Sequence, residues 1–174
     1  EQKWGRFASN YRRRSNGELA TLDGAAGSRF TRPAVTYSGG GGLVSTIGDY
    51  LRFARMLGRL GELDGTRLLS RKTVELMSSN HLPGDMASMG QPRFSESSYE
   101  GIGFGLGVSV TLDPATAQVL GSAGEYAWGG AASTAFWVDP VEEQIVVLLT
   151  QLMPSSLYPL RRELRVLSYQ AIVD

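Results

Sequence analysis

The chain has 174 residues, of which 42% are hydrophobic and 20% charged, and this is enough for one ordinary domain. Its 17 basic and 17 acidic residues balance, so the charge predicts neither a nucleic-acid partner nor an anionic membrane partner. Cys is absent and His81 is the only His, which excludes disulfides, a thiol nucleophile and the two-His motifs of most zinc hydrolases. No cofactor is indicated, and no apolar run approaches the roughly 18–20 residues that span a bilayer. The compartment stays open, with the cytoplasm favoured.

The N-terminal end of the chain predicts irregular structure over residues 1–36. Arg12-Arg13-Arg14 followed by Ser15-Asn16-Gly17 indicates a polar turn. The Arg triplet is either a solvated surface or an anion site, and the neutral net charge favours the surface. Because the chain begins with Glu1 and lacks an initiator Met, we expect it to be a piece of a larger protein.

The next segment predicts two helices and a hairpin. Thr46 and Asp49 stand in a capping-box relation before apolar residues at helical spacing, with Gly58 as the stop. The face expected to be buried carries Ile47, Leu51, Ala54 and Leu57. Asp64-Gly65 marks a short hairpin, and Ser70 caps a second helix that ends near His81. His81 is more typical of a surface helix end than of a catalytic site, and residues 84–100 indicate a long loop.

From Gly101 onward the pattern changes to strands and a final helix. Strands are expected at 101–107, 119–128, 133–138 and 144–150, with a turn at Asp139-Pro140. Residues 160–173 predict an amphipathic helix. Its buried face is expected to carry Leu160, Leu164, Leu167 and Ala171, and its exposed face Arg161, Arg162 and Arg165. The fold class is therefore α+β, with helical and loop segments over 1–100 and antiparallel strands plus a C-terminal helix over 101–174.

The usual hydrolase signatures are missing from the sequence. Gly-x-Ser-x-Gly does not occur, and Ser-x-x-Lys is absent because Leu69 precedes Lys72 by three residues. The only adjacent carboxylates that attract attention, Glu142-Glu143, lie in a turn with no sign of burial. A complete active site is therefore not visible in this chain.

One segment does indicate chemistry: Trp128-Gly129-Gly130 ends one expected strand and leads into the next. Two Gly after a bulky residue allow a substrate to approach the backbone closely, and the next N–H could donate to an oxyanion. A β-bulge with a Trp in the core is the alternative, and spacing alone favours it.

Several short motifs occur in the order found in one hydrolase family. They are residues 37–46, 49–54, 61–65, 69–70, 103–107 and 128–130. Together they resemble the C-terminal half of a serine hydrolase of the class C β-lactamase type, and Trp-Gly-Gly is similar to the family VIII bacterial carboxylesterases. The resemblance covers residues 36–174 and, loosely, the first 35. It implies the C-terminal part of the β-lactamase/transpeptidase-like fold, an antiparallel meander packed by a C-terminal helix and preceded by helical segments.

The resemblance also implies roles for single residues. Trp128, Gly129 and Gly130 match the third motif of the family, which is Lys-Thr-Gly in β-lactamases, and Ala131 N–H matches the oxyanion donor. Trp in place of Lys removes a cation that holds a substrate carboxylate, which favours neutral esters with short acyl chains. The nucleophilic Ser and basic Lys of Ser-x-x-Lys, and the motif that carries a Tyr, have no counterpart in this chain.

The expected function is thus the C-terminal portion of a serine carboxylesterase that acts on a small ester, with this chain inactive by itself. The alternatives are a non-catalytic fragment that self-associates or binds a ligand, and a hydrolase of the β-lactamase or penicillin-binding type. Residues 144–150 are apolar at successive positions, which is typical of a strand inside a sheet. We expect them to pair with an N-terminal half carrying the nucleophile or with a second copy of the chain.

Overall fold

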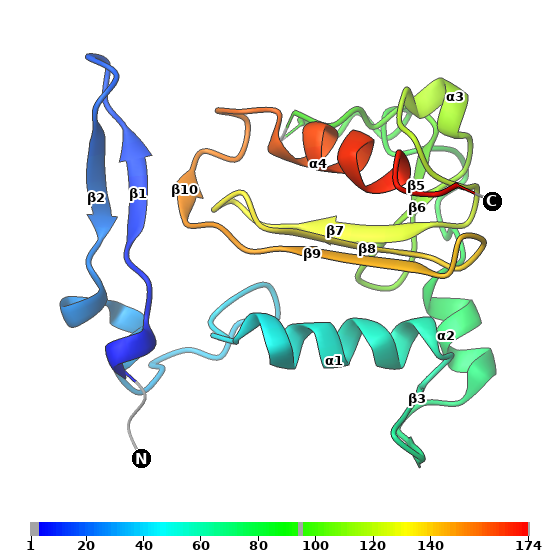
Figure 1. Cartoon of the computed structure of the whole chain (residues 1–174), viewed down its shortest axis with the longest axis horizontal. Coiled ribbons are helices and arrows are strands. Elements are labelled where there is room, and N and C mark those ends of the chain that lie inside the picture. Colours follow the sequence, from blue (N-terminus) through cyan, green and yellow to red (C-terminus); the bar gives the residue numbers. More distant parts are fainter. Residues whose placement is uncertain (1–3, 94–95, 174) are drawn as a thin grey trace.

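The computed structural model describes residues 4–93 and 96–173. Its main sheet is antiparallel and has the order β5-β6-β7-β8-β9. Helix α1 covers one face of this sheet and helix α4 the other (Figure 1). The strands are β5 (Ile102–Phe104), β6 (Ser109–Thr111), β7 (Tyr126–Gly129), β8 (Ala135–Asp139) and β9 (Gln144–Leu148). The α+β class with an antiparallel meander and a C-terminal helix is confirmed.

Helix α1 (Ile47–Gly58) begins where its capping residue predicts. Thr46 Oγ1 accepts a hydrogen bond from Asp49 N–H at 3.2 Å and donates one to the Asp49 carboxylate at 2.8 Å. The helix buries Ala54, Met56 and Leu57 against the sheet. The expectation that Ile47 and Leu51 share this buried face is wrong, because the sheet does not cover their side of the helix and both remain exposed.

The segment after α1 follows the sequence expectation. Strands β3 (Glu62–Leu63) and β4 (Thr66–Arg67) form the small hairpin at Asp64-Gly65. Helix α2 (Arg71–Met77) is capped by Ser70, whose hydroxyl accepts from Thr73 N–H at 3.0 Å. Between α2 and β5, the described residues of the long loop contain no helix or strand.

The N-terminal segment corrects the expectation of irregular structure. Strands β1 (Asn10–Arg13) and β2 (Leu19–Asp23) form an antiparallel hairpin, and β10 (Leu152–Met153) pairs in parallel with β1. The hairpin stands beside the main sheet at the left of Figure 1. Of the residues in β1 and β2 only Ala20 is buried, so the sequence has no apolar alternation to indicate these strands. Three short 3-10 turns flank them, at Trp4–Arg6, Ala25–Gly27 and Arg29–Thr31.

A second correction concerns the strand expected over residues 119–128. The structure has β6, then the short helix α3 (Pro114–Ala117), and β7 begins only at Tyr126. Gly121 and Gly124 adopt φ values of +140° and +90°, which interrupt a strand. The apolar residues before them therefore lie in a turn.

Helix α4 (Leu160–Tyr169) is present, and its orientation agrees with the expectation only in part. Leu160 and Leu164 are partly buried and Arg162 is exposed, as expected. Arg161 and Arg165 point inward, with side chains only 12% and 13% exposed, whereas Leu167 is 58% exposed. Ala171 is also exposed. The reason is electrostatic, because each inward Arg forms an ion pair with a largely buried carboxylate, Glu96 for Arg161 and Glu125 for Arg165.

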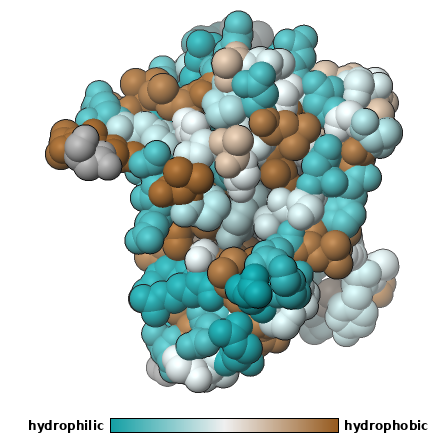
Figure 2. All heavy atoms as spheres, turned by 90° about the vertical axis from the view of Figure 1, so that its right-hand side faces the viewer, coloured by the Kyte–Doolittle hydropathy of each residue, from teal (hydrophilic) through white to brown (hydrophobic). Residues whose placement is uncertain are grey.

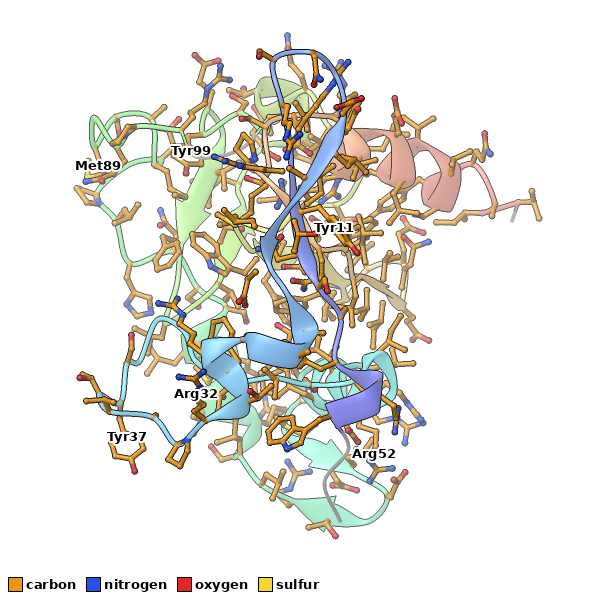
Figure 3. The ribbon with its side chains drawn as sticks, turned by 90° about the vertical axis from the view of Figure 1, so that its left-hand side faces the viewer. Tyr11, Arg32, Tyr37, Arg52, Met89 and Tyr99 are labelled. Atoms are coloured by element: carbon orange, nitrogen blue, oxygen red, sulfur yellow. The ribbon has the colours of Figure 1, made fainter. Side chains whose placement is uncertain are left out.

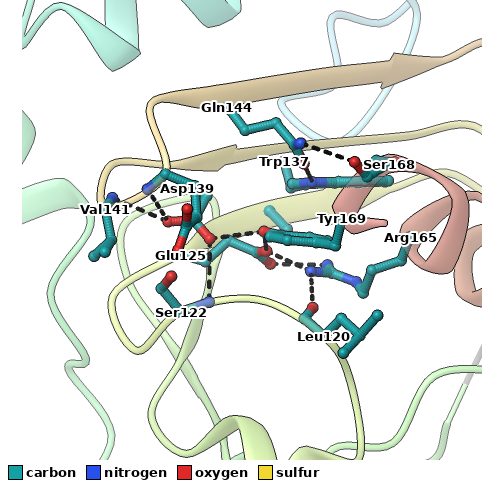
Figure 4. A network of polar contacts seen from close by, with 12 residues as sticks. Leu120, Ser122, Glu125, Trp137, Asp139, Val141, Gln144, Arg165, Ser168 and Tyr169 are labelled. Atoms are coloured by element: carbon teal, nitrogen blue, oxygen red, sulfur yellow. Dashed lines mark hydrogen bonds and ion pairs between the residues drawn. The ribbon is translucent and has the colours of Figure 1, made fainter. Parts of the chain in front are cut away.

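A polar network fastens α4 to the ends of β7 and β8 (Figure 4). Arg165 forms a two-pronged ion pair with Glu125 and lies 4.7 Å from the centre of the Trp137 ring. Tyr169 OH lies 2.7 Å from a carboxylate oxygen of Glu125 and 2.7 Å from one of Asp139. A phenol has one proton, so the two carboxylates share it. Burial and these two acceptors raise the pKa of Tyr169.

The network predicts an acid-sensitive contribution to stability. Burial alone would raise the pKa of Asp139, but hydrogen bonds from Tyr169, Glu142, Ser122 and Val141 outweigh it and lower that pKa. The carboxylate therefore stabilises the fold above its unfolded pKa of about 4, and this stabilisation is lost as the pH falls through the lowered folded value.

We expect Asp139→Asn to lower the free energy of unfolding at pH 7 by about 1–3 kcal/mol and to flatten its decline between pH 5 and pH 2. Urea unfolding followed by circular dichroism at several pH values measures both effects. The matched control is Glu163→Gln on the exposed side of α4, which should change stability by less than about 0.5 kcal/mol. If the free energy of unfolding of Asp139→Asn and of the parent chain fell in parallel with pH, the acid-sensitive stabilisation would not come from Asp139.

Several apolar parts of the described residues are not covered by the rest of the protein. Within the described residues strand β9 pairs with β8 and with no other strand, so one of its edges is open. Val35, Tyr37 and Leu43, in the segment that leads to α1, are almost fully exposed, and Tyr37 points away from the body of the molecule (Figure 3). On the face with α2 and α3, in contrast, apolar groups are interrupted by polar ones (Figure 2). Among the described residues, no helix is long and apolar enough to cross a membrane.

The open edge predicts association of the isolated chain. An unpaired apolar strand is a template for pairing, and Lys at such an edge opposes it. We expect light scattering at micromolar concentration to show species larger than 18.8 kDa, and Val146→Lys on β9 to reduce their fraction. Leu68→Lys, at an exposed position outside the sheet, is the control and should leave association unchanged. A monodisperse parent monomer with exchange-protected amides along 144–150 would show that the edge is covered internally.

Candidate active site

Trp128 lies on β7, opposite Phe136 of β8. Its ring meets the Phe104 ring edge-on, with centroids 5.1 Å apart, and packs against the buried cluster that α1 shares with the sheet. Strands β7 and β8 pair in regular register through Gly129 and Ala135, so no bulge interrupts the paired residues around Trp128. Trp128 is therefore a half-buried side chain at the α1 face of the sheet, close to the end of its strand.

The next residues form a tight hairpin loop of three residues, Ala131 to Ser133. Gly130 C=O accepts from Ser133 N–H at 3.1 Å, and Gly130 N–H donates to Thr134 C=O at 3.0 Å. Ser133 has a φ of +65°, in the left-handed region. This is the arrangement of a type I turn closed by a left-handed residue, which has a fixed backbone shape.

Residues near β10 hold the same loop from outside. Ala132 C=O accepts from Leu152 N–H at 3.1 Å and from the Thr150 hydroxyl at 2.6 Å. The buried Ser133 hydroxyl donates to Leu152 C=O at 2.7 Å. The loop is thus fixed by its own turn and by a segment some twenty residues further along the chain.

Ala131 N–H is the group that this loop presents. Ala131 is exposed, and within residues 4–93 and 96–173 no acceptor takes a hydrogen bond from its N–H. A backbone donor held in a rigid loop and left without a protein acceptor is suited to bind an oxygen anion, because it needs little reorganisation. The geometry brings Trp128, Gly129, Gly130 and Ala131 together at one strand end.

Both glycines of Trp-Gly-Gly lie where side chains would collide. A Cβ at Gly129 would lie 2.9 Å from Arg161 Nε and 3.0 Å from Thr134 C=O. A Cβ at Gly130 would lie 2.5 Å from the Thr134 hydroxyl. The two glycines therefore have a packing reason that does not depend on a substrate.

Other titratable groups are not arranged as a nucleophile with its base in the described residues. Lys72 pairs with Glu75 at 2.6 Å, and His81 Nε2 lies 2.8 Å from Leu76 C=O. Burial raises the pKa of Tyr126, which precedes Trp128 by two residues, to about 12, so this phenol is protonated at neutral pH. Glu142 and Glu143 are exposed in their turn. No group of three or more His, Asp or Glu in this part of the chain is placed to hold a metal.

Sequence analysis did not identify Arg161 and Glu96, which hold the two residues that flank the Ala131–Ser133 loop. Arg161 Nη2 donates to Gly130 C=O and to Thr134 C=O, both at 2.9 Å. Its Nη1 donates to Glu96 at 2.7 Å, and its backbone N–H donates to the other oxygen of that carboxylate at 3.2 Å. The spacing of four residues between Arg161, Arg165 and Tyr169 was the available signal, since it places three polar groups on one helix face.

The sequence and the fold have counterparts among known proteins. The Beta-lactamase family model matches residues 2–170. Protein Rv1367c of Mycobacterium tuberculosis H37Rv is 40% identical over 121 residues, which are 66% of this chain and 29% of that protein. The uncharacterized protein MT1414 of Mycobacterium tuberculosis CDC 1551 matches to the same extent, so the chain spans less than a third of these relatives.

Two solved structures have a similar fold. EstCE1, described as a hydrolase with promiscuous acyltransferase activity, matches 97% of this chain and 45% of its own, with a TM-score of 0.75 and 24% identity. The simvastatin synthase LovD from Aspergillus terreus matches 92% of this chain and 40% of its own, with a TM-score of 0.71 and 24% identity. At this identity the likeness concerns the fold. The chain belongs to the Beta-lactamase family and has the C-terminal part of the β-lactamase-like serine hydrolase fold.

Proposed function

We propose that this chain is the part of a serine carboxylesterase that supplies the oxyanion donor, and that the nucleophile and its base come from outside it. The observation that carries the proposal is Ala131 N–H, which has no acceptor among the described residues and belongs to an exposed residue directly after Trp128-Gly129-Gly130. Loss of one such donor in a hydrolase costs about 2.7–4 kcal/mol of transition-state stabilisation. Membership of the Beta-lactamase family supports the same reaction class.

In the proposed reaction a Ser hydroxyl attacks the ester carbonyl while a base takes its proton. The carbonyl oxygen becomes an oxyanion and accepts a hydrogen bond from Ala131 N–H. Collapse of this intermediate breaks the bond to the alcohol, which leaves with the proton, and an acyl-enzyme remains. Water then attacks the acyl-enzyme through a second oxyanion and releases the acid and the free Ser.

Trp128 bears on the choice of substrate. The resemblance implies that it replaces the Lys of the Lys-Thr-Gly motif of β-lactamases, and an indole offers no charge to a substrate carboxylate. We propose that the Trp128 ring, which meets Phe104 edge-on, instead offers the substrate an apolar wall. Neutral esters with short acyl chains are therefore the proposed substrates, and a β-lactam hydrolase is the alternative within the same family.

A second candidate is a non-catalytic fragment that self-associates. The open edge of β9 and the exposed apolar residues before α1 favour this candidate. It differs from the first in one respect that can be measured, because it requires no nucleophile elsewhere in the polypeptide. The intact mass of the native protein, with its sequence, shows whether a segment containing Ser-x-x-Lys accompanies this chain.

The substrate proposal is tested on the full-length protein that contains this chain. We expect p-nitrophenyl acetate and butyrate to be hydrolysed with a kcat/KM well above that for the chromogenic cephalosporin nitrocefin. The reverse order would favour the β-lactam alternative. No turnover of either class by a folded full-length protein would reject the hydrolase proposal.

Trp128→Ala tests the place of the ring in the site. We expect kcat/KM for p-nitrophenyl butyrate to fall about tenfold or more, because the variant loses the apolar wall and loosens the strand end before Ala131. The matched control is Trp4→Ala, which truncates a partly exposed Trp in the first 3-10 turn and should leave turnover unchanged. Unchanged ester kinetics in Trp128→Ala would reject the site assignment, and loss of folding would favour a purely structural role for the ring.

A further inference from the structure

The peptide group between Gly130 and Ala131 has two ends with different partners. Its C=O belongs to Gly130 and its N–H to Ala131, and a trans peptide is planar, so the two bonds point in opposite directions. Whatever fixes the direction of Gly130 C=O therefore also fixes the direction of Ala131 N–H. The C=O end accepts from Arg161 on α4 and from Ser133 N–H within the turn, and the N–H end is therefore directed away from both donors.

Arg161 is suited to hold this peptide group firmly. One nitrogen, Nη2, bridges the carbonyls of Gly130 and Thr134 at 2.9 Å each, across the two arms of the hairpin. Hydrogen bonds from a guanidinium are stronger than those from neutral donors. A cation at the C=O end also draws electron density from the amide and makes its N–H a better donor.

Glu96 holds Arg161 in turn. Its carboxylate accepts from the side chain and from the backbone N–H of Arg161, and both side chains are nearly buried, at 12% and 13% exposure. A charge pair removed from water in this way is costly to separate, so the guanidinium has one defined position. Gly129 leaves room for it, because a Cβ there would meet Arg161 Nε at 2.9 Å.

We propose that Arg161 is a positioning residue for the oxyanion donor. Held by Glu96, it orients and polarises the Gly130–Ala131 peptide from the α4 side of the sheet. This inference rests on the proposed function and extends it to a residue that touches no substrate. It also assigns a reason to Gly129, which allows the guanidinium to reach the loop. Neither residue belongs to a nucleophile or base.

The test uses the full-length enzyme and compares Arg161→Gln with Arg162→Gln. Arg162 is the next residue on α4, is exposed, and makes no contact with the loop among the hydrogen bonds of the described residues. For Arg161→Gln we expect kcat for p-nitrophenyl butyrate to fall about 10- to 100-fold with KM changed less than about threefold, since an oxyanion donor acts mainly in the transition state. Arg162→Gln should retain the parental kcat.

The inhibition constant of a trifluoromethyl ketone separates a positioning role from a general structural role. The ketone adds reversibly to the Ser and forms a hemiketal whose oxyanion occupies the donor site. For Arg161→Gln its Ki should rise by about the same factor as kcat/KM falls, as expected for an interaction specific to the oxyanion. A lower kcat with an unchanged Ki would overturn the proposal.

Gly129→Ala keeps the proposal testable if Arg161→Gln fails to fold. The added Cβ displaces the guanidinium while the Arg161–Glu96 pair stays in the chain, so the same split between kcat and KM is expected. Parental kcat in a folded Arg161→Gln or Gly129→Ala variant would overturn the positioning role and leave the esterase proposal intact. Absence of ester hydrolysis by the parent enzyme would instead reject the proposed function and this inference with it.

Discussion

Two arginine–carboxylate pairs beneath α4 are the constraint on which the rest of the structure depends. Arg161 with Glu96 and Arg165 with Glu125 are almost withdrawn from solvent. A buried charge that loses its partner costs about 3–5 kcal/mol, so these pairs allow only one placement of the helix over the sheet. They connect α4 to the long loop before β5 and to the start of β7. An apolar helix face could slide by a turn, whereas these pairs fix its register.

The two faces of the main sheet differ in chemical character. The α4 face is polar and ordered, with Tyr169 bridging Glu125 and Asp139 at the ends of β7 and β8. The α1 face is apolar and carries Trp128, Phe136 and the helix residues that pack on them. The loop from Ala131 to Ser133 lies where β7 ends and is reached from the α4 face by Arg161. The ordered α4 face thereby holds the peptide group that carries the proposed donor.

The chain accounts for only one part of the proposed chemistry. Among the described residues, Lys72 pairs with Glu75 and His81 contacts Leu76 C=O, and no Ser is paired with either. The apolar segment before α1 is exposed, and one edge of β9 is unpaired within the described residues. The proposed nucleophile would approach the donor loop from outside this chain, which agrees with relatives more than three times as long as the matched region.

The sequence by itself determined the local features. Thr46 and Ser70 begin their helices through side-chain caps, Asp64-Gly65 makes its hairpin, and the last strands follow from their apolar residues. It also located Trp128-Gly129-Gly130, because a motif is visible in any chain that contains it. Only the tertiary structure decided that Arg161 and Arg165 face inward, since their partners lie 65 and 40 residues away. The β1–β2 hairpin likewise depends on β10, more than a hundred residues distant. Periodicity in a sequence reports hydrophobic contacts along one element, and it cannot report a charge whose burial is made possible by a carboxylate elsewhere in the chain.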